Sequence, residues 1–110
     1  MANEWENVET KIDKIIAGSS EPFDVSTIEN VRDFLVLVRG RYAIPGVSRG
    51  YWSTIILDWE STARGDLEIE IFDDRLEIYH LKPKLEVWYE PHTAGQAFSP
   101  ELIAELPPVV

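Results

Sequence analysis

The sequence contains no cysteine, which excludes disulfide bonds and thiol chemistry. It also has no run of about 20 apolar residues, the length that a helix needs to span a bilayer. The N-terminal segment Met1–Trp5 is acidic and lacks the apolar core of a signal peptide. These absences predict a cytoplasmic protein that does not enter a membrane.

Positive charge is scarce, with 10 Lys and Arg against 20 Asp and Glu and a formal net charge of -10 at pH 7. Such a charge repels phosphate backbones and anionic lipids, so direct binding to nucleic acid or to a membrane is disfavoured. Residues 51–90 carry 10 acids and 4 bases, whereas residues 1–50 carry 8 acids and 6 bases. This distribution indicates a basic partner, although charge that only keeps the protein soluble explains it equally well.

Motifs that mark catalysis or cofactor binding are missing. The sequence has no glycine-rich phosphate loop, no nucleophile elbow and no basic-aromatic RNA-binding pattern. Its histidines, His80 and His92, lack the spacing of zinc ligands, and a structural or surface role is favoured for them. The adjacent carboxylates Asp73 and Asp74 fit a solvated turn better than an acid-base pair. We therefore predict no enzymatic activity, no metal and no cofactor.

Two helices are predicted in the first half of the chain. Apolar residues recur at intervals of three and four between Glu4 and Ala17, the spacing of an amphipathic helix that ends at Gly18. A second helix is expected from Ser26, in a Ser-Thr-Ile-Glu capping box, to a C-terminal Gly40. The expected inner stripe of this helix consists of Ile28, Val31, Leu35 and Val38.

The second half alternates apolar and polar residues, as antiparallel strands with one wet face do. Arg41–Tyr51 is expected to be an irregular connection, because it contains Pro45, Gly46 and Gly50. Strands are predicted over 53–59, 67–72, 75–81 and 84–90, with turns at Asp73-Asp74 and at 82–84. The side chains expected to point inward are Ile55, Leu57, Trp59, Leu67, Ile69, Ile71, Leu76, Ile78, Leu85, Val87 and Tyr89, and Trp5 and Trp52 are expected in the same core.

These elements predict one α+β domain over residues 1–106. Two N-terminal helices pack on a four-stranded antiparallel meander, because each layer then buries the apolar side of the other. A short C-terminal helix begins at Ser99-Pro100, with serine as N-cap and proline at the first helical position. Residues 107–110, which begin with two prolines, are predicted to be a flexible tail.

The outward face of the predicted meander combines carboxylates with aromatic rings. Carboxylates attract and pair with Lys and Arg, and rings contribute buried area, a mixture typical of protein-docking surfaces. An ordinary solvated sheet face with cross-strand ring pairs is the alternative. The predicted partner-binding residues are Glu68, Glu70, Glu77, Tyr79, Glu86 and Trp88.

An ordered set of motifs accompanies these strands: Leu57-Asp-Trp59, Leu67-Glu-Ile-Glu-Ile71, Asp73-Asp74 and Glu77-Ile-Tyr79, preceded by Ile44-Pro-Gly-Val47 and Gly50. Over about residues 22–81 this order resembles a family of small, uncharacterised bacterial and mobile-element proteins. The resemblance implies the fold and a setting in phage, toxin or defence loci, without an agreed activity. The Gly-Trp-Asp-Gly element usual in that family is replaced here by residues 19–24.

The leading functional hypothesis is a small acidic protein-binding module that masks a basic surface on a protein partner. An inhibitor, an antitoxin or an anti-defence factor would act in this way. One alternative is a homo-oligomeric assembly protein, in which the sheet edge or the helix pair forms a homodimer. Another is a DNA mimic whose carboxylates imitate the phosphates of a duplex.

Overall fold

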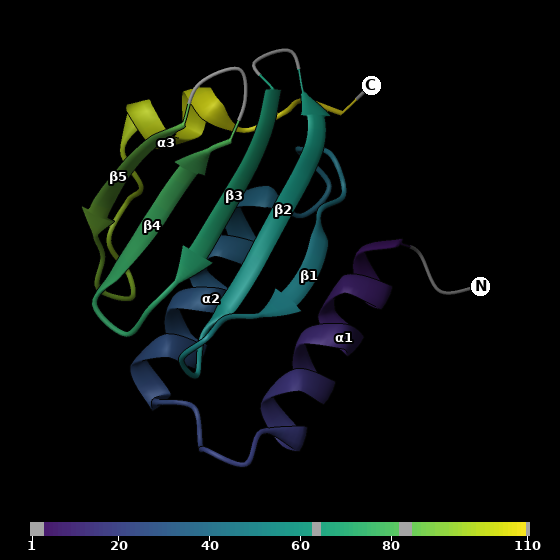
Figure 1. Cartoon of the computed structure of the whole chain (residues 1–110), viewed down its shortest axis with the longest axis vertical. Helices are drawn as coiled ribbons and strands as arrows, with labels where there is room; N and C mark the ends of the chain where they lie inside the picture. Colours follow the sequence, from purple (N-terminus) through teal and green to yellow (C-terminus); the bar gives the residue numbers. More distant parts are fainter. Residues whose placement is uncertain (1–3, 63–64, 82–84, 110) are drawn as a thin grey trace.

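The computed structural model describes residues 4–62, 65–81 and 85–109, and two helices come first along the chain (Figure 1). They are α1 (Glu4–Gly18) and α2 (Val25–Val38). α1 buries Trp5, Val8 and Ile12, as its spacing predicts. In the described ranges no helix is long and apolar enough to cross a membrane.

The start of α2 differs from the prediction. Asp24, and not Ser26, is the N-cap, and its carboxylate accepts a hydrogen bond of 2.8 Å from the backbone N–H of Ser26. Asp24 has the extended backbone conformation of a helix cap, and its short side chain reaches the free N–H groups of the first turn. The predicted capping box is therefore wrong, although the helix itself is confirmed.

Five strands form one antiparallel meander in the order β1-β2-β3-β4-β5. Their bounds are β1 (Gly46–Arg49), β2 (Ile55–Thr62), β3 (Gly65–Ile71), β4 (Arg75–His80) and β5 (Glu86–Pro91). The short helix α3 (Pro100–Glu105) follows, with Ser99 as its N-cap. The α+β class with two N-terminal helices, an antiparallel meander and a C-terminal helix is confirmed.

β1 is the fifth strand, which the sequence did not predict. It lies within Arg41–Tyr51, where proline and glycine indicated a loop, and it has only four residues. Only Val47 is buried, so the strand has too few side chains to display an alternation. It forms because it pairs with β2, where Val47 lies opposite Leu57.

The main core lies between the sheet and α2, which crosses behind the strands in Figure 1. Strands β2, β3 and β4 turn their apolar residues toward the helix as predicted, and α2 contributes Val31, Phe34 and Val38. Trp59 is buried and satisfies its indole N–H by donating to the Ala43 carbonyl at 2.8 Å. The residues of the sheet that make this core are Ile55, Leu57, Trp59, Leu67, Ile69, Ile71, Leu76 and Ile78.

The predicted orientation of β5 is wrong. Trp88 lies opposite Ile78 on the inner face, packs against the core and stacks on His80 with ring centroids 5.9 Å apart. Leu85, Val87 and Tyr89, expected inside, have 62%, 54% and 66% of their surface exposed. Alternation alone favours the opposite phase, because Leu85, Val87 and Tyr89 form an apolar row, whereas Trp88 lies between Glu86 and Glu90. The inner phase provides one large ring for the core and places Glu90 where its carboxylate accepts from Ser99 at the start of α3.

A second correction concerns Trp52, which was expected in the core. It lies in the loop between β1 and β2 with 63% of its surface exposed, and its ring meets the edge of the Tyr51 ring at 4.9 Å between centroids. The other two tryptophans assigned to the core, Trp5 and Trp59, are buried. An aromatic residue in a glycine-flanked loop is thus a poor indicator of burial here.

The ends of the sheet are tied to other segments. The Asp73-Asp74 turn joins β3 to β4 as predicted, whereas the turn predicted at 82–84 lies outside the described residues. In the predicted C-terminal tail, the Pro107 carbonyl accepts from the Ala43 N–H at 2.9 Å, and Pro108 forms a β-bridge with Tyr42. These contacts connect the end of the chain to the segment before β1.

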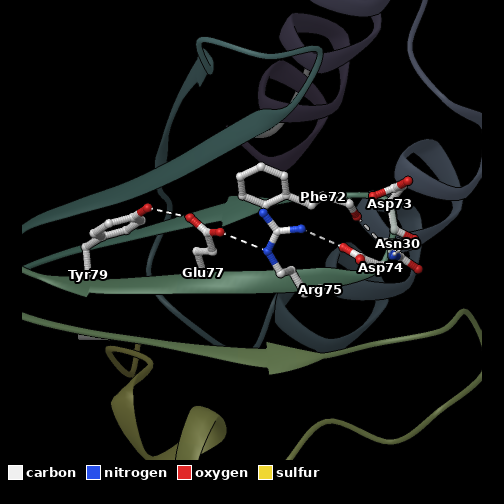
Figure 2. Close-up of polar contacts among 7 residues, drawn as sticks. All are labelled: Asn30, Phe72, Asp73, Asp74, Arg75, Glu77 and Tyr79. Carbon is white, nitrogen blue, oxygen red and sulfur yellow. Dashed lines mark hydrogen bonds and ion pairs between the residues drawn. The ribbon is translucent and has the colours of Figure 1, made fainter.

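Asn30 anchors α2 to the β3–β4 turn. Its side chain is 1% exposed, and its amide donates to the carbonyls of Phe72 at 3.0 Å and Asp73 at 3.2 Å (Figure 2).

We expect Asn30→Ala to lower the free energy of unfolding by about 1–3 kcal/mol, because both carbonyls lose a buried donor. Denaturant unfolding measures the change. Asn7→Ala, at an exposed position of α1, is the control and should cost less than about 0.5 kcal/mol; equal losses in the two variants would contradict the anchor.

Candidate protein-binding surface

The side of the sheet turned away from α2, here called the outer face, is built from two cross-strand rows. No helix in the described part of the chain lies over it, and it faces the viewer in Figure 1. The register defines the rows, because residues directly opposite one another on paired strands share a face. One row runs Ile56, Glu70, Glu77, Tyr89, and the other runs Asp58, Glu68, Tyr79, Val87.

Carboxylates lie directly opposite one another in both rows. Asp58 pairs with Glu68 across β2 and β3, and Glu70 pairs with Glu77 across β3 and β4. Like charges in this position repel and destabilise the sheet. Burial raises the pKa of Glu68 above its usual range, and the charges of Asp58 and Glu70 raise it further. The free protein therefore holds an electrostatic repulsion at the centre of its outer face.

Glu77 is the carboxylate of this face whose charge is best compensated. Its two oxygens accept from the Tyr79 hydroxyl at 2.6 Å and from the Arg75 Nε at 2.8 Å (Figure 2). Arg75 also donates to Asp74 at 2.7 Å, and its guanidinium lies 4.0 Å from the centre of the Phe72 ring. The hydrogen bond to Glu77 is the main cause that raises the pKa of Tyr79 to about 12. The network holds both the ring and the guanidinium in place.

The remaining carboxylates differ in their partners. Glu70 accepts from the Thr54 hydroxyl at 2.6 Å, which fixes its position without neutralising its charge. Across residues 4–62, 65–81 and 85–109, no ion pair or hydrogen bond joins the side chain of Asp58 or Glu68 to a donor. These two neighbouring groups are available to a cation from outside the protein.

Exposed apolar side chains flank the carboxylates on the β5 side. Val87 is the outer-face neighbour of Tyr79, and Tyr89 is the neighbour of Glu77. Leu85, just before the strand, is also exposed. A charged centre beside an apolar and aromatic margin is the composition of surfaces that bind proteins.

The structure brings together four of the six predicted partner-binding residues. Glu68, Glu70, Glu77 and Tyr79 share the outer face. Glu86 and Trp88 do not belong to it, since they lie opposite His80 and Ile78 on the inner face.

The sequence does not predict the contribution of Val87 and Tyr89 to this face, because its alternation places them in the core. The strand itself contains no signal for the correct orientation, because Glu86 and Glu90 share the phase of Trp88 and favour its exposure. Deciding between the phases requires knowing that Glu90 binds the start of α3.

Each histidine pairs with one carboxylate and connects a helix to the sheet. His80 bonds Glu105 of α3, and His92 Nε2 lies 2.7 Å from Asp33 Oδ2 of α2. Within the described residues, no group of three or more His, Asp and Glu is placed to hold a metal ion. These pairs join the layers of the fold and leave the outer face as the main candidate site.

A second surface feature is an open groove of about 330 Å³ between α1 and α2. Its floor consists of core side chains such as Ile12 and Val31, and the ion pair between Glu9 and Arg39, at 2.9 Å, bridges the two helices. Its charged rim is already paired in part, unlike the centre of the outer face.

Comparison of the chain with protein-family models, with curated proteins and with solved structures finds no match.

The raised pKa of Glu68 predicts a pH-dependent effect of Glu68→Gln. The folded protein binds this proton more tightly than the unfolded chain, whose group has a pKa of 4.5, so stability falls as pH rises above that value. The amide should therefore raise the free energy of unfolding at neutral pH by up to about 1 kcal/mol, the scale of a cross-strand charge pair. The gain should vanish in acid and shrink in high salt.

Chemical denaturation of both proteins across the pH range measures this gain. Glu60→Gln, which removes an exposed carboxylate from the same sheet, is the matched control and should change stability little at any pH. A loss of stability in Glu68→Gln at neutral pH would show that the charge is satisfied in the folded protein.

Proposed function

We propose that this protein is a small acidic protein-binding module whose outer face masks a basic surface on a protein partner. The observation that carries the proposal is the pair Asp58 and Glu68, side by side on an uncovered sheet face and without a cationic partner in the described residues. An inhibitor, antitoxin or anti-defence role would be a specific use of the same masking.

Binding of a cation to the outer face releases electrostatic free energy. Repulsion between Asp58 and Glu68 is present in the free protein and is relieved when a Lys or Arg side chain lies between them. The cation therefore gains attraction to two carboxylates at once. The net charge of -10 also attracts a basic partner over a distance and speeds its association.

The apolar margin of the outer face contributes to binding as well. Tyr79 is held by Glu77 before any partner arrives, so its ring loses little conformational freedom on binding. Tyr89 and Val87 add exposed apolar area next to it. Burial of this area contributes affinity that charge alone does not provide.

The same apolar margin favours binding to a basic protein surface over mimicry of a DNA duplex. A DNA mimic needs negative charges spaced along an extended surface, as in the phosphate backbone. On the outer face the carboxylates are interrupted by Arg75, Ile56 and the apolar residues of β5. This mixed composition matches the core and rim of a protein interface better.

The test compares three baits in affinity capture: the wild type, Asp58→Asn/Glu68→Gln, and the control Asp13→Asn/Glu101→Gln. The control removes the same charge from exposed positions on α1 and α3. We expect a basic protein to be retained by the wild type and the control and to be lost by the outer-face variant. Calorimetry with the purified partner should show affinity at least about tenfold weaker for that variant, or about 1.4 kcal/mol.

Salt dependence completes this test. Binding through the outer face should weaken as salt is added, because both surfaces are charged. Equal affinities of the two double variants for the captured protein would refute the proposed surface, and capture of acidic proteins alone would refute the proposed partner chemistry.

A further inference from the structure

Among the described residues, β5 is the last strand of the sheet and pairs with β4 alone (Figure 1). Backbone groups of alternate residues in an antiparallel strand point to opposite sides. The N–H of His92 donates to the Asp74 carbonyl at 3.0 Å, which establishes the phase of the pairing between β4 and β5. In this phase the residues that bond to β4 are Glu86, Trp88 and Glu90, and the strand residues that direct N–H and C=O to the open edge are Val87 and Tyr89. Leu85 directly precedes the strand.

Pro91 agrees with this phase. Its nitrogen lies on the open side, opposite Arg75 in a pair that exchanges no backbone hydrogen bonds, so its missing N–H removes nothing from the ladder. Among the described residues, no backbone hydrogen bond is formed by Val87 or Tyr89 on the open side. The edge therefore offers unpaired donors and acceptors.

The residues with free backbone groups also carry the exposed apolar side chains of this region. Leu85 is 62% exposed, and Val87 and Tyr89 are similarly open. Edge strands are usually protected by lysines, bulges or prolines, because an apolar edge invites another strand. β5 has Pro91 at its end, and its central residues have no such protection.

We propose that β5 pairs in antiparallel fashion with β5 of a second copy of this chain, around a twofold axis at Val87. The two sheets then continue into one, and the outer faces of the two copies lie on the same side. This inference goes beyond the masking function and does not depend on it.

When two copies of β5 pair around Val87, the residues that lie opposite one another are compatible. Leu85 lies opposite Tyr89 of the second copy, and Val87 lies opposite Val87, so each outer-face pair is apolar. On the inner face Glu86 lies opposite Trp88. Every residue with free N–H and C=O groups meets another such residue, and no two carboxylates face each other.

The two neighbouring registers are less stable, because each places carboxylates directly opposite one another. An axis one residue nearer the N-terminus places Glu86 opposite Glu86 of the second copy. An axis one residue nearer the C-terminus places Glu86 opposite Glu90, and it also requires a backbone N–H from Pro91. Like charges directly opposite one another destabilise a sheet, so the strand selects the register centred on Val87.

The charge of the chain gives this association a distinct salt dependence. Each copy carries -10, so two copies repel at long range and salt screens that repulsion. Dimerisation should therefore strengthen as salt is added. Binding of a basic partner through the outer face weakens under the same change, and the two events are separable in one set of measurements.

Sedimentation equilibrium of the full chain, from micromolar to millimolar concentration and in low and high salt, tests the proposal. We expect a monomer-dimer equilibrium whose dissociation constant rises at least about tenfold in Val87→Glu, which places two carboxylates at the axis. Val36→Glu adds the same charge at a 75% exposed position of α2 and should leave the constant unchanged. A wild type that stays monomeric at the highest concentration in high salt would overturn the proposal.

Val87→Pro provides an independent variant without a change of charge. It removes the N–H that points to the open edge and leaves the bonds to β4 in place, a substitution that edge strands tolerate. Circular dichroism and thermal unfolding verify that the variants are folded. We expect this variant to lose dimerisation as well. Dimers that persist in both folded Val87 variants would place the contact elsewhere, such as the groove between α1 and α2, and would refute the β5 edge.

Discussion

Packing of the apolar rows of β2, β3 and β4 against α2 is the interaction on which the rest of the structure depends. Because successive residues of a strand face opposite sides, burial of Leu57 and Ile69 places Asp58 and Glu68 on the outer face. Each buried aliphatic side chain stabilises the fold by about 1.5–3 kcal/mol, more than a repulsive carboxylate pair costs at the surface. Burial of the core therefore outweighs the repulsion among the carboxylates of the outer face.

The sequence predicts best where every residue of one phase is apolar and every residue of the other phase is charged. In β3, leucine and isoleucine alternate with carboxylates, so both the burial of Ile69 and the exposure of Glu68 are predicted correctly. β1 is too short to show a pattern and exists through its pairing with β2. In β5 the apolar row of Val87 and Tyr89 predicts one orientation, but the structure packs Trp88 against the core instead. Tertiary contacts, here the stacking on His80, decide such cases.

The same error affected the candidate site. Glu68, Glu70, Glu77 and Tyr79 followed from alternation alone, whereas Glu86 and Trp88 depended on the phase of β5. Reversing that phase replaces them by Val87 and Tyr89, which adds an apolar margin to the acidic centre. The outer face and the open edge of β5 are thus adjacent, and they respond to salt in opposite directions. One sheet provides a surface for a basic partner and an edge for a second copy.

The orientation of β5 is the central claim, because the apolar margin of the outer face and the residues of the open edge both follow from it. Hydroxyl-radical footprinting with mass spectrometry measures it directly, by comparing the oxidation of individual side chains in the native protein. We expect Tyr89 to react about as readily as the exposed Trp52, and Trp88 to be protected toward the level of the buried Trp59. Strong oxidation of Trp88 together with protection of Tyr89 would show that β5 has the opposite orientation, and it would contradict the account.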